Sequence, residues 1–159
     1  MEHLTPAARA DVLDIMQHGR DMTLATIRPD GYPQATTVSY IHDGPTLYTV
    51  IGLGSQKAAN IQHNNKVSAT ITLDYDDWRQ IRGISLGGTA EFVQGADEMD
   101  RIAQALLRKF PELADVIRDT DTLPWPGMLF LRIHPTVFSV LDYSVSFGHT
   151  KLYDMAPDA

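Results

Sequence analysis

A hydrophobic alternation with a period of two, broken by short turn-forming segments, is the feature that most constrains the fold. It covers three runs, Met22–Arg28, Gln34–Ile41 and Thr46–Ile51, which are separated by RPDGYP and HDGP. Proline presets one turn dihedral and glycine supplies conformational freedom, so such segments are typical of tight turns. Strands joined by connections this short pair antiparallel, because a parallel pair needs a long crossover. The pattern therefore predicts a β-meander.

The rest of the chain combines further strands with a few helices. Helical spacing predicts helices over 5–18, 55–63, about 97–110 and 111–117, with Thr5, Ser55 and Asp97 as N-caps. Strands are expected over 67–73 and 81–93, followed by two strand pieces over 128–143 that are interrupted near Pro135. Because strands mostly follow one another without long crossovers, an antiparallel sheet or barrel is favoured over a doubly wound parallel sheet.

The sequence thus predicts one mainly β domain with flanking helices (α+β). We expect it to span 1–159, with an N-terminal helix over 5–18, a barrel over about 20–142 and a C-terminal segment over 143–159.

The charge balance and the absence of cysteine exclude several function classes. The chain has 13 Lys and Arg against 20 Asp and Glu, a net charge of −7, and its cations are scattered. Neither nucleic acid nor a membrane surface is therefore an expected partner. Without cysteine there is no disulfide, thiolate nucleophile or cysteine–zinc site, and the six histidines form neither HxH nor HExxH, so no metal site is expected. With no signal peptide or membrane span, a cytoplasmic location is predicted.

The segment LYTVIGLGSQKAANI, residues 47–61, indicates an anion site. A strand ends there, two glycines turn the chain, and Ser55 begins a helix whose first N–H groups are free. Lys57 lies in the first helical turn, where a cation opposes the helix dipole unless an anion lies between them. A phosphate held by Ser55 and Lys57 satisfies this arrangement. The alternative is that Ser55 is only a cap and Lys57 only solvated.

The segment RQIRGISLGGTAEFV, residues 79–93, contains three glycines that weaken its strand and need a reason. The reason is either a β-bulge or the close approach of a flat ligand. Arg82 is either a second cation for a phosphate or a surface arginine paired with Asp74, Asp76 or Asp77.

The C-terminal segment LDYSVSFGHT, residues 141–150, is aromatic and polar. Either it closes over a ligand, or its Tyr143 and Phe147 pack into the core.

Three motifs in this order resemble the flavin-binding split-barrel family that includes pyridoxamine-phosphate oxidase. They are TLATIRPDGYPQATTVSY at 23–40, LYTVIGLGSQKAANIQHNNKVSATI at 47–71 and ISLGGTAEFV at 84–93. The resemblance covers about residues 20–142, and the order of elements agrees throughout.

The resemblance implies an antiparallel split β-barrel that forms a homodimer with FMN between the two chains. Carried over by position, residues beside the flavin ring are Gln34, Ala35, Thr36, Thr37, Val38 and Ser39, and those under the cofactor are Tyr48 and Thr49. The phosphate would be held by Ser55, Gln56 and Lys57, with Arg82 close to the same pocket. Tyr143, Phe147 and His149 are expected on the substrate side.

The sequence departs from pyridoxamine-phosphate oxidase itself at three cations. Gln34, Ser39 and Gln56 stand where that enzyme has arginine, lysine and arginine. The C-terminal arginine–histidine pattern of that enzyme is also absent, with only His149 nearby. Pyridoxamine-phosphate oxidase activity is therefore not expected.

The interpretation is an FMN-dependent oxidoreductase for an unidentified small molecule, with NAD(P)H as the usual donor and no catalytic acid or base identified. The alternatives are a deazaflavin-dependent reductase, a haem-binding or haem-degrading protein with His149 or His63 as ligand, a flavin-binding protein without turnover, and a split barrel that has lost its cofactor.

Overall fold

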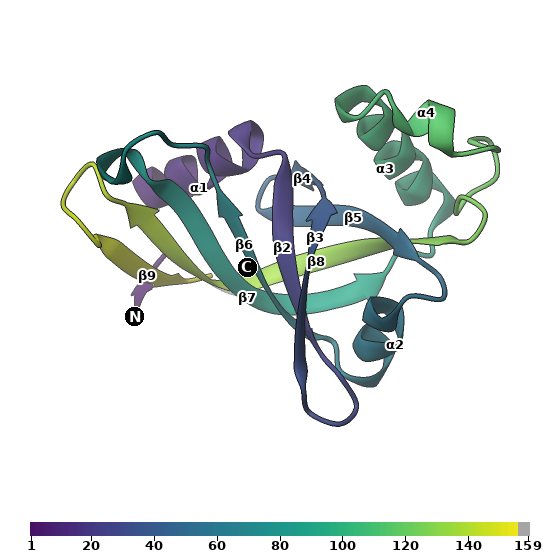
Figure 1. Ribbon diagram of the computed structural model, residues 1–159, viewed down its shortest axis with the longest axis horizontal. Coiled ribbons are helices and arrows are strands. Elements are labelled where there is room, and N and C mark those ends of the chain that lie inside the picture. Colours follow the sequence, from purple (N-terminus) through teal and green to yellow (C-terminus); the bar gives the residue numbers. More distant parts are fainter. Residues whose placement is uncertain (156–159) are drawn as a thin grey trace.

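The computed structural model describes residues 1–155 as a single nine-stranded sheet with helices against its faces and ends (Figure 1). Its strands are β1 (Glu2–His3), β2 (Asp21–Ile27), β3 (Pro33–Ser39), β4 (Ile41–Asp43), β5 (Thr46–Gly52), β6 (Lys66–Thr72), β7 (Arg82–Phe92), β8 (Met128–Asp142) and β9 (Thr150–Asp154). Its helices are α1 (Pro6–His18), α2 (Gln56–His63), α3 (Ala96–Lys109), α4 (Leu113–Val116) and the 3-10 turn η1 (Trp78–Gln80).

The sheet is bent into a barrel that does not close, which confirms the split barrel. Its hydrogen-bonded order is β1-β9-β8-β7-β6-β2-β3, and β5 pairs with β8 and β4 rather than with β3. A side chain bridges the unpaired strands, because the Thr49 hydroxyl on β5 donates to the Ser39 carbonyl at the end of β3, 2.5 Å away. One edge of β3 is therefore left without a partner strand.

Two hydrophobic clusters hold the fold together. The first fills the barrel under α1, where Val12 and Ile15 pack against inward residues of the strands such as Leu24 and Phe138. The second lies between α3 and the strands β5 and β8, and it includes Leu106. It also includes Trp125, whose ring meets Phe130 edge-on at 5.1 Å, so the loop before β8 is anchored in this core.

The glycines of β7 are explained by the neighbouring strand. The register between β7 and β8 shifts between Gly87 and Gly88, so Thr136 has no opposite residue and the ladder has a bulge. A Cβ on Gly88 would lie 2.2 Å from the His134 carbonyl oxygen, which leaves no room for a side chain. The bulge interpretation is thus confirmed, and β8 is one bent strand of 15 residues rather than the two predicted pieces.

Two further predictions need correction at the helix and chain ends. Gly95, not Asp97, is the N-cap of α3, while Asp97 lies in the first turn, where its charge favours the helix dipole. The C-terminal segment, of which residues 143–155 lie within the structure's description, contains the unpredicted strand β9. This strand pairs with β8 on one side and with β1 on the other. In the described part of the chain, no helix has the length and apolarity to cross a bilayer.

Candidate functional site

The segment in which an anion site is predicted forms the start of α2. β5 ends at Gly52, and the Ser55 backbone N–H and hydroxyl both donate to the Gly52 carbonyl, at 3.1 and 2.7 Å. The same hydroxyl accepts a hydrogen bond from the Ala58 N–H at 3.2 Å, which caps the helix. Lys57 lies in the first turn without an ion pair to any residue in 1–155. Free N–H groups and a cation without an ion pair among these residues therefore share the first turn of α2.

Asn60 joins α2 to β2 and β3 through a buried amide network. Its side chain is 0% exposed and donates to the Thr26 hydroxyl at 2.9 Å and to the Gln34 amide oxygen at 3.0 Å. Its own amide oxygen accepts from Gln56 at 2.8 Å. Gln34, one of the two glutamines that replace cations, thus holds α2 against β3, while the other, Gln56, braces Asn60 within the helix. Asn60 was not predicted as a site residue, although an amide beside buried Ala58 and Ile61 on a short helix was a usable signal.

The unpaired edge of β3 extends from this network toward α3 and α4. Antiparallel strands direct alternate backbone N–H and C=O groups to each side, so about half of those of β3 face away from β2. Ala35 and Thr37 point outward, whereas Thr36 points inward, where its hydroxyl is buried and without a hydrogen bond. Beyond Ser39 lies a cavity of about 340 Å³ lined mainly by Thr37, Val38, Ser39, Val50, Phe110 and Leu113. The candidate site is therefore a strip, with the first turn of α2 and Lys57 at one end and a part-apolar cavity at the other.

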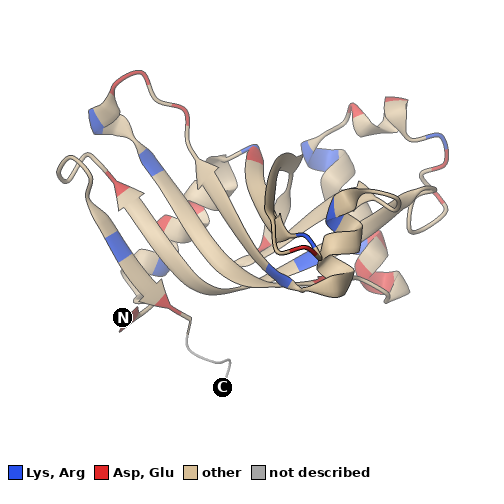
Figure 2. Cartoon of the chain, turned by 60° about the horizontal axis from the view of Figure 1, so that its bottom comes forward, with Lys and Arg blue, Asp and Glu red and all other residues tan. Residues whose placement is uncertain are grey.

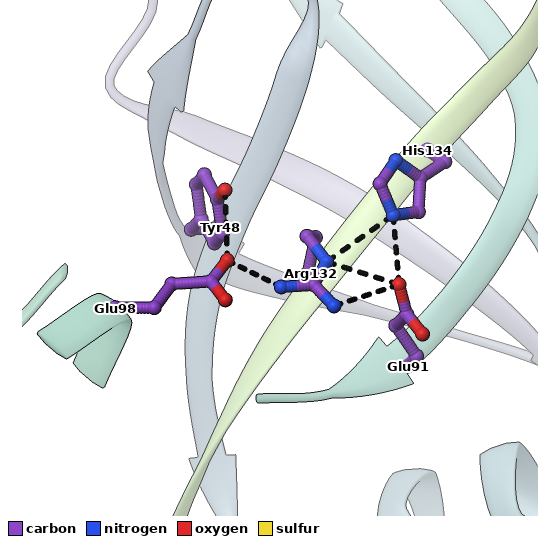
Figure 3. Close-up of polar contacts among 5 residues, drawn as sticks. All are labelled: Tyr48, Glu91, Glu98, Arg132 and His134. Atoms are coloured by element: carbon purple, nitrogen blue, oxygen red, sulfur yellow. Dashed lines mark hydrogen bonds and ion pairs between the residues drawn. The ribbon is translucent and has the colours of Figure 1, made fainter. Parts of the chain in front are cut away.

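Tyr48 does not lie in the same environment as the start of α2. It lies in the cluster between β5 and α3, and its hydroxyl donates to Glu98 at 3.1 Å (Figure 3). Burial, followed by the Glu98 hydrogen bond and charge, raises the pKa of Tyr48. Thr49 points to the other side and bonds to Ser39.

An ion network continues from Glu98 across β8 to β7 (Figure 3). Arg132 bonds to Glu98 and, at 2.8 Å, to Glu91, which also lies 2.8 Å from His134 Nε2. The hydrogen bonds from Arg132 are the main cause that lowers the pKa of Glu91 and of Glu98. The bond to Glu98 is in turn the main cause that raises the pKa of Arg132. The network fixes the start of α3 to the barrel, and Leu106, further along the same helix, lines the cavity.

Glu98→Gln is expected to remove an acid-sensitive part of the stability. Because the folded-state pKa of Glu98 is lowered, its stabilisation is present above the ordinary value of 4.5 and is lost as pH falls through the folded pKa. The difference in melting temperature between wild type and variant should therefore be largest near pH 7 and shrink on acidification below pH 4.5. Asp115→Asn, at an exposed site of α4, is the control. A difference independent of pH would contradict the ion pair.

Arg82 does not reach the anion site of its own chain. It is bound at 3.1 Å to Asp14 and lies 4.0 Å from Asp11, both on α1. It is thus a paired arginine, although its partners come from α1 rather than from the acidic loop that the sequence suggested. Docking of α1 at this end of β7 is a tertiary feature that local sequence does not encode.

Tyr143, Phe147 and His149 lie in the loop between β8 and β9, also away from α2 (Figure 1). The Phe147 ring is exposed and packs on Tyr143 at 5.5 Å, so the alternative in which these two residues pack into the core is wrong. Within residues 1–155, no group of three or more His, Asp and Glu side chains is arranged to hold a metal ion.

Comparison with known families agrees with this geometry. The family model of pyridoxamine 5'-phosphate oxidase matches residues 9–136. The chain belongs to that family. General stress protein 26 of Bacillus subtilis is 26% identical over 124 residues, which is 78% of this chain and 81% of that protein.

Solved structures share the family's fold at low sequence identity. The heme binding protein from Mycobacterium smegmatis has a TM-score of 0.78 at 18% identity, and the match covers 94% of this chain and 59% of that one. HutZ, the heme storage protein from Vibrio cholerae, has a TM-score of 0.65 at 17% identity over 84% of this chain and 90% of its own. These likenesses show the fold alone.

Proposed function

We propose that this protein binds FMN and serves as a flavin-dependent oxidoreductase. The observation that carries the proposal is the unpaired Lys57 at the start of α2, next to the open edge of β3. A ligand that fits this strip has an anionic group at one end and a flat, hydrogen-bonding body at the other. FMN has both.

The residues present fit the cofactor in two places. Ser55 and Lys57 would hold the phosphate together with the first N–H groups of α2. The outward N–H groups of β3 between Gln34 and Ser39 would hold the polar edge of the ring and stabilise negative charge on it. When bound, FMN supplies the redox chemistry, while the protein binds and orients it.

Gln56→Arg is expected to tighten FMN binding several-fold. Lys57 has no ion-pair partner among residues 1–155, and Gln56 is exposed beside it in the first turn of α2. A guanidinium there adds a charge-assisted hydrogen bond to the phosphate, although it gives up the 2.8 Å bond to Asn60. Titration of FMN fluorescence measures the change, with Gln62→Arg at the other end of α2 as the control. Equal tightening in both variants would indicate a general charge effect.

The expected partners are a second copy, a small-molecule substrate and NAD(P)H as electron donor. An uncharged part of the outer sheet face supports the dimer. Two central rows of outward residues cross β3, β2, β6, β7 and β8 in that order. The first row is Thr37, Thr23, Thr70, Ser85 and Ser139, and the second is Ala35, Ala25, Ser68, Gly87 and Val137. For a chain of net charge −7, such a face is where two copies approach with least repulsion. A cytoplasmic location remains a prediction.

The absorbance spectrum of the purified protein, before and after addition of FMN and desalting, tests the proposal. Retained flavin bands would support it, and bleaching by NAD(P)H would then identify the donor. A Soret band would instead favour haem, the ligand named for two structural neighbours, with His63 and His149 as the first candidates. A colourless protein would overturn the FMN proposal and leave deazaflavin or no cofactor.

A further inference from the structure

A cavity of about 470 Å³, here called the α3–β4 cavity, lies between α3, β4 and the end of α1. It shares no lining residue with the cavity of the candidate site. Its lining includes two cations, Arg108 and Lys109, and no carboxylate. Acidic residues are spread over the molecule (Figure 2), and the chain has a net charge of −7. A cavity with this charge is therefore a place where the protein attracts an anion.

Lys109 is a half-buried cation whose position is fixed. Its Nζ donates to the Gly19 and Tyr40 carbonyls at 3.1 and 2.8 Å and lies 4.0 Å from the centre of the Tyr40 ring. Burial lowers the pKa of Lys109, against the opposing charge of Asp21. Among residues 1–155 it forms no ion pair. An anion in the cavity would supply the opposite charge that a buried cation requires.

Arg108 is exposed beside Lys109 and likewise forms no ion pair within the described chain. Both residues belong to the last turn of α3, where a cation is favoured by the helix dipole. The dipole explains their charge, but it does not require that both border one cavity. The planar guanidinium presents paired N–H groups that match the two oxygens of a carboxylate.

The other wall of the α3–β4 cavity is held in place by hydrogen bonds. His42 Nδ1 on β4 lies 2.9 Å from the Gly44 carbonyl oxygen, and its Nε2 lies 3.2 Å from the Gln17 amide oxygen at the end of α1. Buried Met16 and Ile41 add apolar surface to this wall. The cavity is thus formed before any ligand enters, which lowers the entropic cost of binding.

The cavity continues along α3 into a second one of about 390 Å³, which also contains Ile41, Ala105 and Arg108. Asp43 and Asp100 border only this second part. A negatively charged ligand group is therefore favoured at the end with the two cations. The apolar surface between the two ends suits an uncharged part of the same ligand. Cavities of about 300–1,000 Å³ are typical of small-molecule sites.

We propose that the α3–β4 cavity binds a small organic acid. Its carboxylate lies between Arg108 and Lys109, and its apolar part lies against Ile41 and Ala105. This site is separate from the proposed FMN site, because α3 stands between the two cavities and presents Leu106 and Phe110 to the other one. The proposal therefore does not depend on the proposed function.

Calorimetric titration of the purified protein with 4-phenylbutyrate tests the proposal. This probe should bind at one site per chain and should shift the NMR signals of the Arg108 and Lys109 backbone amides. The uncharged 4-phenylbutyramide and inorganic phosphate should each bind at least tenfold more weakly, because one lacks the charge and the other lacks the apolar part. Absent binding of the probe, equal binding of either analogue, or signal shifts confined to other elements would overturn the proposal.

Two variants examine the cavity itself. Arg108→Ala should weaken binding of 4-phenylbutyrate at least tenfold, and Ala105→Glu, which adds a carboxylate inside the cavity, should abolish it. Neither position is buried, so both chains should fold. Arg118→Ala, which removes an exposed cation beyond the end of α4, is the control and should bind as wild type does. Wild-type affinity in either cavity variant would contradict the proposal.

Titration of the probe in the presence of saturating FMN separates the two sites. The affinity for 4-phenylbutyrate should stay unchanged, whereas displacement of the probe by FMN would mean that the two share one site and would overturn the proposal. If wild type binds the probe but no FMN, the proposed function fails while the organic-acid site stands.

Discussion

Asn60→Leu is expected to lower the free energy of unfolding by about 3–5 kcal/mol, because it removes all three hydrogen bonds of a buried amide at once. The Asn60 side chain has no exposure to water, and its partners Thr26, Gln34 and Gln56 belong to three different elements. Leucine has a similar volume, so the loss reports polar groups left without partners rather than a cavity. Urea denaturation followed by circular dichroism measures it.

Gln62→Leu is the matched control, since it makes a comparable change at an exposed position of the same helix. It should change the unfolding free energy by less than about 0.5 kcal/mol, as is usual for surface substitutions. Equal stability of Asn60→Leu and Gln62→Leu would contradict the amide network. Loss of FMN binding in Asn60→Leu at low temperature, where the chain stays folded, would show that the network also positions the start of α2.

Lys57→Ala is expected to weaken FMN binding by about 10- to 100-fold, which corresponds to about 1.4–2.8 kcal/mol. A charge-assisted hydrogen bond to a phosphate has this size. Within residues 1–155, Lys57 has no carboxylate partner, so its removal frees no opposing charge that would complicate the result. The salt dependence of the dissociation constant should also decrease, because one ionic contact is lost.

Lys151→Ala provides the comparison, since Lys151 lies on β9 and faces Glu2 at 3.8 Å, far from α2. It should leave FMN binding unchanged. If Lys57→Ala bound FMN as tightly as wild type, the phosphate would lie elsewhere. Riboflavin, which lacks the phosphate, should bind wild type and Lys57→Ala equally, which separates the phosphate contact from contacts with the ring.

Much of the fold is readable from local sequence. The period of two over residues 22–51 and the turn residues between the runs predict β2, β3 and β5 because each depends on neighbours in the chain. The short strand β9 and its pairing with β1 were not predicted, since neither segment carries a periodic signal. The Arg82 ion pairs were also not predicted, because they depend on the packing of α1 against the barrel, which is a tertiary interaction.

The candidate site was likewise predictable only where it depends on local sequence. Ser55 and Lys57 were predicted from a local conflict, a cation in the first turn of a helix, and the structure places both at the start of α2. The hydrogen bonds of Tyr48 to Glu98 and of Gln34 to Asn60 were not predicted, because these partners are distant in sequence. Whether these residues touch a cofactor stays a prediction.

The central place of β8 in the sheet bears on how the chain folds as it is synthesised. This strand pairs with β5, β7 and β9, which makes it the element that unites both halves of the sheet. The pairing of β5 with β8 cannot form until the residues from Met128 onward have been synthesised. Gly52, the last residue of β5, has left the ribosome long before then. Non-local pairing of this kind is slow, and unpaired strands are exposed to misassembly until it is complete. We therefore expect ribosome-bound chains that end before residue 142 to be protease-sensitive and to depend on chaperones.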